Sequence, residues 1–192
     1  MKFQQLMVVW LCVLLFSGCT SMPGRDEIIG AEPSDEPVDI EVESFPAWNS
    51  TDHDGQFMSD SGLSGGAYMA YFSAPWCTHC EPTLDAYNSV IPSDRMMIFS
   101  IEDDEEYSNM SDWHSRMESK LNTTLNQSFM LMPELAYSIG VRSIPHAVYV
   151  NEQGFVYDVE IGKRTNLTEI QSIWDKTLVA MFNSTTGWSD EI

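Results

Sequence analysis

The stretch Ala74-Pro75-Trp76-Cys77-Thr78-His79-Cys80 contains two cysteines with two residues between them. The apolar run before it, residues 67–72, follows two glycines and predicts a buried strand. After it, apolar side chains recur at the spacing of one helix face: Leu84, Tyr87 and Val90. The sequence therefore predicts a strand, a turn that carries the cysteine pair, and a helix.

A cysteine pair at a strand-to-helix turn suits dithiol chemistry. Unpaired backbone N–H groups and the helix dipole favour a thiolate at a helix N-terminus, where we expect Cys77 to be exposed. Cys80 lies one turn further along and is close enough to close a disulfide. The other two cysteines, Cys12 and Cys19, precede the folded region, so this is no disulfide-stapled scaffold.

Half of a zinc site is the alternative interpretation of two cysteines at this spacing. Zinc needs two further ligands, and the chain has neither a second cysteine pair nor two histidines at the usual spacing. The candidate nitrogen ligands are the four scattered histidines: His53, His79, His114 and His146. We therefore expect no metal.

Two further residues accompany the cysteines. Trp76 directly precedes the pair, and Ile144-Pro145 leads into a later strand predicted at residues 147–150. This combination resembles the thioredoxin superfamily. The resemblance implies that Cys77 attacks, that Cys80 resolves the mixed disulfide, and that Pro145 is cis and faces the dithiol. It also implies that Trp76 and the Ile144 backbone present the substrate, with no bound cofactor.

A short hairpin before the cysteine strand narrows the resemblance to the TlpA/ResA-like branch. Two short strands are expected around an Asp54-Gly55 turn, within residues 45–57. The stretch from Cys80 to Pro145 leaves room for the extra helix of that branch. The predicted fold is α/β and thioredoxin-like: a central mixed sheet flanked by helices, with an N-terminal hairpin and an inserted helix.

His79 lies between the cysteines, as in the motifs of DsbA and protein disulfide isomerase. A partly positive imidazole near Cys77 would stabilise its thiolate and make the couple more oxidising, whereas a solvent-facing His79 would have little effect. His146, after Pro145, is expected near the dithiol or, equally, in the core.

One position departs from the family pattern. Where many thioredoxin-like proteins carry a buried carboxylate that shuttles protons, this chain has Tyr71. Either another group serves, with Glu81 as the candidate, or deprotonation of Cys80 is slow.

The other predicted elements follow from apolar spacing. A strand is expected at 95–102, helices at 110–121 and 133–139, and a return strand at 155–161. Asn166 is expected to cap a last helix at 167–182, with one face towards the sheet: Ile170, Ile173, Trp174, Leu178 and Met181.

The domain plan begins with a lipoprotein-type signal peptide at residues 1–18, because the apolar run at 6–16 is too short to span a membrane. Small residues before Cys19 resemble a lipobox, so Cys19 is the candidate for lipid attachment; an ordinary signal peptide is the alternative. Residues 19–42 are acidic and proline-containing and predict a flexible tether. The thioredoxin-like domain is placed at 43–182 and a polar tail at 183–192.

The charge and the sequons indicate where the protein works. A formal charge of −20 excludes nucleic acid and anionic lipid surfaces as partners. Six of the eight asparagines begin an Asn-x-Ser/Thr sequon, which predicts N-glycosylation outside the cytoplasm: Asn49, Asn109, Asn122, Asn126, Asn166 and Asn183.

The predicted function is extracytoplasmic thiol–disulfide exchange with protein substrates through Cys77 and Cys80. Its expected partners are those substrates, an electron partner, and the membrane through the lipid anchor. A secreted protein or one of the endoplasmic-reticulum lumen is the alternative location. A non-enzymatic thioredoxin-like adaptor, or a metallochaperone that uses the same cysteines, is the alternative function.

Overall fold

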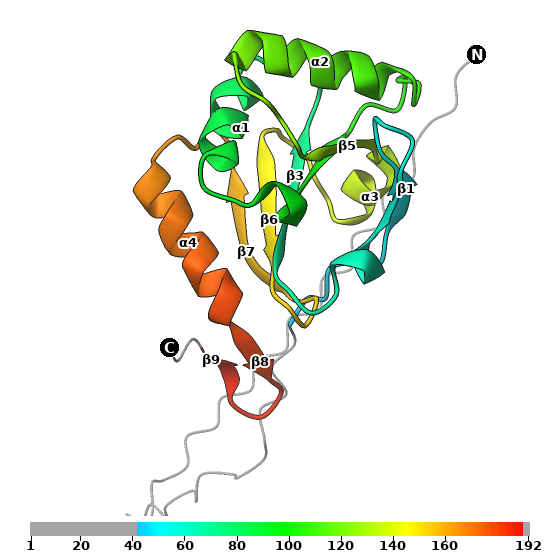
Figure 1. Ribbon diagram of the computed structural model, residues 1–192. Coiled ribbons are helices and arrows are strands. Elements are labelled where there is room, and N and C mark those ends of the chain that lie inside the picture. Colours follow the sequence, from blue (N-terminus) through cyan, green and yellow to red (C-terminus); the bar gives the residue numbers. More distant parts are fainter. Residues whose placement is uncertain (1–41, 190–192) are drawn as a thin grey trace, which may run out of the picture. The chain divides into compact units, whose positions relative to one another are not determined.

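A five-stranded mixed sheet forms the centre of the protein (Figure 1). The structure, a computed structural model, describes residues 42–189. The strand order is β5-β4-β3-β6-β7. The strands run Tyr68–Ser73 (β3), Met96–Ser100 (β4), Ser128–Leu131 (β5), His146–Val150 (β6) and Val156–Ile161 (β7). β3, β4 and β5 are parallel to one another. β6 is antiparallel to its neighbour β3, and β7 is antiparallel to β6. This is the predicted mixed sheet.

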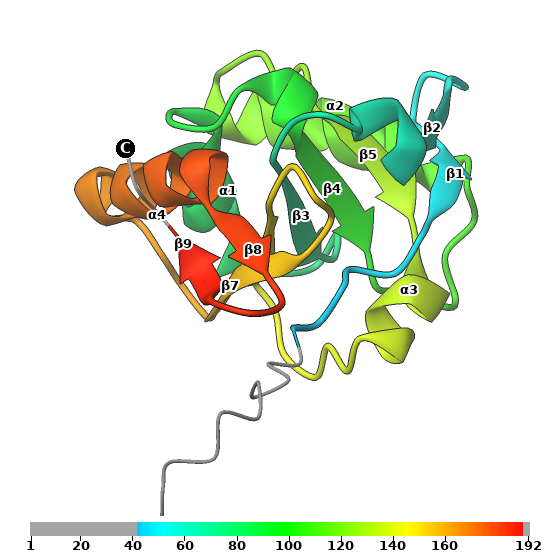
Figure 2. The same ribbon diagram turned by 90° about the horizontal axis from the view of Figure 1, so that it is seen from below.

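Helices cover both faces of the sheet, as predicted (Figure 1 and Figure 2). On one face, the buried core includes side chains of α1 (Cys80–Asn88), α2 (Asn109–Leu121) and α4 (Leu167–Val179). On the other face, α3 (Pro133–Ser138) packs with the segment that leads into the first strand and with Leu63 of a short 3-10 helix, Asp60–Leu63. The two cysteines belong to the first of these cores.

The inserted region after β4 contains a helix and also a strand. The helix α2 matches the prediction, with Trp113 and Met117 buried. The sequence did not predict β5, which pairs in parallel with β4 at the edge of the sheet. Only four residues form β5, and two of its side chains are buried, so neither alternation nor length marks it as a strand.

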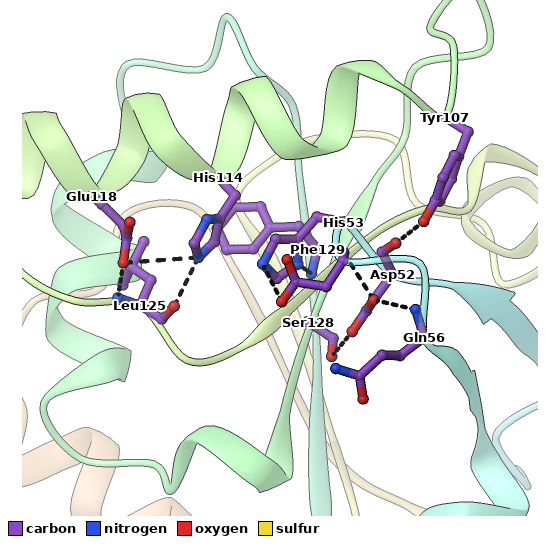
Figure 3. Close-up of polar contacts among 10 residues, drawn as sticks. Asp52, His53, Gln56, Tyr107, His114, Glu118, Leu125, Ser128 and Phe129 are labelled. Atoms are coloured by element: carbon purple, nitrogen blue, oxygen red, sulfur yellow. Dashed lines mark hydrogen bonds and ion pairs between the residues drawn. The ribbon is translucent and has the colours of Figure 1, made fainter.

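The predicted N-terminal hairpin is formed by β1 (Asn49–Thr51) and β2 (Phe57–Ser59). Its turn lies against the inserted region (Figure 3). The Asp52 carboxylate accepts the Ser128 hydroxyl of β5 at 2.9 Å. His53 stacks on His114 of α2 with 3.9 Å between ring centroids, and its Nδ1 accepts the Phe129 N–H at 3.3 Å. The hairpin thus covers the outer edge of the sheet, where an isolated bridge also pairs Asp52 with Met130.

The C-terminal prediction needs correction. Helix α4 ends at Val179, because residues 181–189 form a hairpin of β8 (Met181–Asn183) and β9 (Gly187–Ser189). Leu178 and Met181 are exposed, so they do not face the sheet as predicted, whereas Ile170 and Trp174 do. The hairpin is held to the body through Gln153, whose side-chain oxygen accepts the Phe182 N–H.

Within residues 42–189, no helix is long and apolar enough to cross a membrane. The signal peptide, Cys19 and the tether up to residue 41 lie outside the described residues.

Candidate active site

Cys77 and Cys80 form a disulfide at the end of β3, with 5.3 Å between their Cα atoms. Helix α1 begins at Cys80, so Cys77 lies in the turn before the helix rather than in its first turn. The sequence analysis expected an exposed Cys77, and this is wrong. Cys77 is buried, with 6% of the residue exposed, against 3% for Cys80. Its sulfur is bonded to Cys80, and both residues pack into the core beneath α1. Cys77 is still the more accessible of the two.

Trp76 is an exposed aromatic residue at the site. It is 63% exposed and lies directly before Cys77. Its indole N–H donates to Oε1 of Glu102 at 2.7 Å. Glu102 follows β4, and β3 and β4 are parallel, so the two segments that leave these strands meet at the same edge of the sheet. The bond gives Trp76 a fixed direction on the surface.

The Ile144–Pro145 peptide bond is cis. Strand β6 begins with the next residue, His146, which pairs with Phe72 in antiparallel register. One step further along this register, Pro145 lies opposite Ser73, the last residue before the turn that carries the cysteines. Ile144 packs against the core that contains both cysteines. The register therefore brings Pro145 to the end of β3 at which the turn with the two cysteines begins.

Tyr71 occupies the position at which the sequence analysis noted the missing carboxylate. It is fully buried, and its hydroxyl donates to the backbone carbonyl of Cys80 at 2.9 Å. Burial, with a smaller effect of Tyr87, raises the pKa of Tyr71 well above its ordinary value of 10. Tyr71 is therefore a neutral donor at physiological pH, and it ties β3 to the first turn of α1.

Solved structures with a similar fold were found by comparison. A thiol:disulfide interchange protein of the thioredoxin family from Chlorobium tepidum is 20% identical, with a TM-score of 0.56 over 71% of this chain and 97% of the other. A secreted Mycobacterium tuberculosis disulfide oxidoreductase, described as homologous to E. coli DsbE, is 16% identical, with a TM-score of 0.52 over 66% and 93%.

StoA from Bacillus subtilis is 18% identical, with a TM-score of 0.51 over 67% of this chain and 96% of StoA. The chain has the thioredoxin fold. No family model and no curated protein sequence matches it. At these sequence identities the similarity concerns the fold alone. The thioredoxin-like fold that the sequence predicted is therefore confirmed.

The remaining predicted residues are dispersed around the thioredoxin fold. His79 is exposed at the N-cap of α1 and makes no capping bond with its side chain. Glu81 is paired with Lys120 of α2. His146 is not near the dithiol, because its side chain lies on the opposite face of the sheet, packed edge-on to Phe72. It is buried, its Nδ1 has no partner among the described residues, and burial lowers its pKa.

A half-buried carboxylate does lie against two tyrosines of the cysteine core, but it comes from another strand. Glu160 of β7 accepts the hydroxyls of Tyr87 at 3.0 Å and Tyr149 at 3.2 Å. Its other oxygen accepts from Arg164 Nε at 2.8 Å. Burial raises the pKa of both tyrosines, so both remain donors. No sequence signal marked Glu160, since a lone glutamate in an edge strand is ordinarily solvated.

The sequence analysis also missed Glu102 as the partner of Trp76. A signal for it was present, because parallel strands end at one edge of a sheet and the residues after β3 and β4 must therefore be neighbours. For metal binding, the described residues contain no group of three or more His, Cys, Asp or Glu side chains that could hold an ion.

Proposed function

We propose that this protein is an extracytoplasmic thiol–disulfide oxidoreductase that exchanges disulfides with protein substrates through Cys77 and Cys80. The observation that carries the proposal is the Cys77–Cys80 disulfide in the turn after β3. This turn also carries the exposed Trp76, and the cis Pro145 lies opposite the last residue of β3. The disulfide is buried, but Trp76 next to it is 63% exposed, so an external thiol would approach the Cys77 sulfur from the side of Trp76.

The proposed exchange begins at Cys77, the more exposed of the two residues. A substrate thiolate attacks the Cys77 sulfur, the Cys77–Cys80 bond breaks, and Cys80 leaves as a thiolate that takes up a proton. The mixed disulfide between Cys77 and the substrate is then attacked by a second substrate thiol. The substrate leaves oxidised and the protein leaves with two thiols. The reverse sequence reduces a substrate disulfide, so the direction depends on the reduction potential.

Support for a place outside the cytoplasm comes from the asparagines. All six sequon asparagines are exposed, whereas the two asparagines outside sequons are not: Asn88 is half-buried and Asn151 is buried. Asn88 accepts the Gln127 side chain, and Asn151 bonds to the backbone of the loop around it. Exposure is what a glycosyltransferase needs, and disulfides persist in such compartments.

We further propose that a diacylglycerol on Cys19 anchors the protein, with residues 20–42 as the tether. A flexible acidic segment would let the thioredoxin-fold domain reach partner proteins near the membrane while repelling the anionic lipid surface.

A direct test is disulfide exchange with dithiothreitol, a small uncharged dithiol. The oxidised wild-type protein should be reduced at a measurable rate, and the reduced protein should in turn reduce insulin or a disulfide peptide. Cys77→Ser should lose both reactions. Thr78→Ser is the matched control, because it makes a conservative change in the same turn and should retain them. A wild-type protein inert towards dithiothreitol would instead support the adaptor, whose disulfide is static.

A further inference from the structure

Five consecutive carboxylates follow β4, and the first of them contacts Trp76, the residue next to Cys77. Residues 102–106, here named the acidic loop, follow β4 with the sequence Glu-Asp-Asp-Glu-Glu. The first, Glu102, holds the indole of Trp76. Directly after the loop, the Tyr107 hydroxyl donates to the backbone carbonyl of Asp52. The acidic loop is therefore tied at both ends, and one end contacts the residue next to Cys77.

The acidic loop has no cation of its own. Among the ion pairs within residues 42–189, none joins a loop carboxylate to a lysine, arginine or histidine. One carboxylate oxygen of Glu105 is shielded from solvent and finds no hydrogen-bond partner in the same part of the chain. Carboxylates that no cation of the protein neutralises attract cationic groups of a partner.

A groove of about 510 Å³ adjoins the acidic loop. It runs between the segment after β4 and helix α3, and it ends near Val141, three residues before Ile144. Its lining combines apolar side chains with two carboxylates: Ile101, Asp103, Pro133, Glu134, Ala136, Tyr137 and Val141. Tyr137 is 73% exposed. The Arg142 guanidinium lies over the Tyr137 ring, 5.5 Å from its centroid.

We propose that this groove and the acidic loop bind a basic, extended segment of the partner protein, in which lysines or arginines flank the cysteine that reacts with Cys77. The inference rests on the proposed function and names its substrate class. Lysine and arginine match the site because their apolar stems pack on aromatic surface while their charged ends reach carboxylates. Trp76 and Tyr137 supply that aromatic surface, and the loop supplies the carboxylates.

The charge of the loop acts on encounter rather than on chemistry. In the exchange step the partner's thiolate forms a bond to the Cys77 sulfur, and the Cys77–Cys80 bond breaks, with Cys80 taking the electron pair and then a proton. No external oxidant or reductant is needed. Flanking cations raise the local concentration of the partner at the acidic loop, and salt screens this attraction.

The test compares three single-cysteine peptides of equal length whose flanking residues are lysine, serine or glutamate. Each reduced peptide is mixed with the oxidised full-length protein, and mixed-disulfide formation is followed by acid quenching and mass spectrometry. At low ionic strength the lysine peptide should react about tenfold faster than the serine peptide, and the glutamate peptide more slowly than both. Raising the salt concentration should compress these ratios.

A charge-neutralised loop shows whether the preference is local. The variant Asp103→Asn, Asp104→Asn, Glu105→Gln, Glu106→Gln keeps Glu102, so Trp76 keeps its partner. A matched variant neutralises four exposed acids on other elements: Asp94→Asn, Glu152→Gln, Glu169→Gln and Asp175→Asn. Both change the net charge by the same amount. The loop variant should lose most of the lysine preference, and the matched variant should retain it.

Dithiothreitol separates failure of this inference from failure of the proposed function, because it carries no charge apart from the thiolate through which every probe reacts. If dithiothreitol reduces all three proteins equally while the peptides react without charge preference, or while both variants lose the preference equally, the basic-segment inference is overturned and the proposed function stands. If dithiothreitol does not reduce the wild-type protein, the proposed function fails first.

Discussion

At the scale of single residues, the site depends on a few neighbours of the cysteines. Four site residues were identifiable from the sequence because its motif resembles that of the thioredoxin superfamily: Trp76, Cys77, Cys80 and Pro145. The burial of Cys77 was not predictable, because accessibility depends on how the turn packs onto the core. Glu102 and Glu160 act through contacts between segments distant in sequence, which no local pattern reveals.

Tyr71 leads to a prediction about the pH dependence of exchange. Tyr71→Phe removes the hydrogen bond to the Cys80 carbonyl and should lower the free energy of unfolding by about 1 kcal/mol. Because burial holds the pKa of Tyr71 well above 10, the hydroxyl does not titrate between about pH 5 and about pH 9. The pH profile of the exchange rate should therefore keep its shape.

Urea denaturation of the oxidised protein measures the stability change, and exchange with dithiothreitol over that pH range measures the profile. A profile displaced along the pH axis in Tyr71→Phe would show that the tyrosine handles the Cys80 proton, against this account.

At the scale of elements, the sequence predicted the strand–turn–helix unit, α2, α3 and the β6–β7 hairpin because each has a clear apolar period or turn residues. It did not predict β5, and it extended α4 through Met181. Both errors occur where tertiary pairing decides the state of a short segment. Strand β5 exists because β4 and the N-terminal hairpin lie on either side of it, and β8 exists because β9 pairs with it.

The docking of the N-terminal hairpin should depend on pH. His53 Nδ1 accepts the Phe129 N–H, so protonation there would place two donors face to face. Burial, and next the stacked His114, lower the pKa of His53 from 6.5, although Asp54, Asp52 and Glu118 oppose the shift. The folded state thus binds fewer protons than the unfolded chain. The stabilisation is complete above about pH 6.5 and is lost as the pH falls through the lowered pKa.

His53→Gln retains a hydrogen-bond acceptor but does not titrate. Its unfolding free energy, measured by urea denaturation, should fall less steeply below about pH 6.5 than that of the wild-type protein. His79→Gln is the control, because His79 is exposed at the end of α1, and this variant should follow the wild type. Equal slopes for His53→Gln and the wild type would contradict the role assigned to His53.

At the scale of the whole molecule, charge and sequons dominate. The formal charge of −20 is spread over the chain, but the acidic loop concentrates part of it after β4, where its first residue contacts Trp76. The composition alone did not indicate this placement, since the position of the loop relative to the cysteines depends on the parallel pairing of β3 and β4.

Glycosylation is the prediction that belongs to this scale. In protein isolated from its native source, we expect glycans on the six exposed sequon asparagines and none on Asn88 or Asn151. Tandem mass spectrometry of tryptic peptides would locate them. Carbohydrate at none of the six positions would argue against passage through a glycosylating compartment.

The central claim is that Cys77 and Cys80 are a reversible redox couple, and its most direct measurement is the reduction potential. The full-length protein is equilibrated in graded glutathione buffers and the thiols are trapped by alkylation. The account predicts complete equilibration, at a potential between the value of about −270 mV of thioredoxin and the value of about −120 mV of DsbA. A pair that stays oxidised in every buffer and never equilibrates would contradict the account and leave a thioredoxin-fold adaptor with a static disulfide.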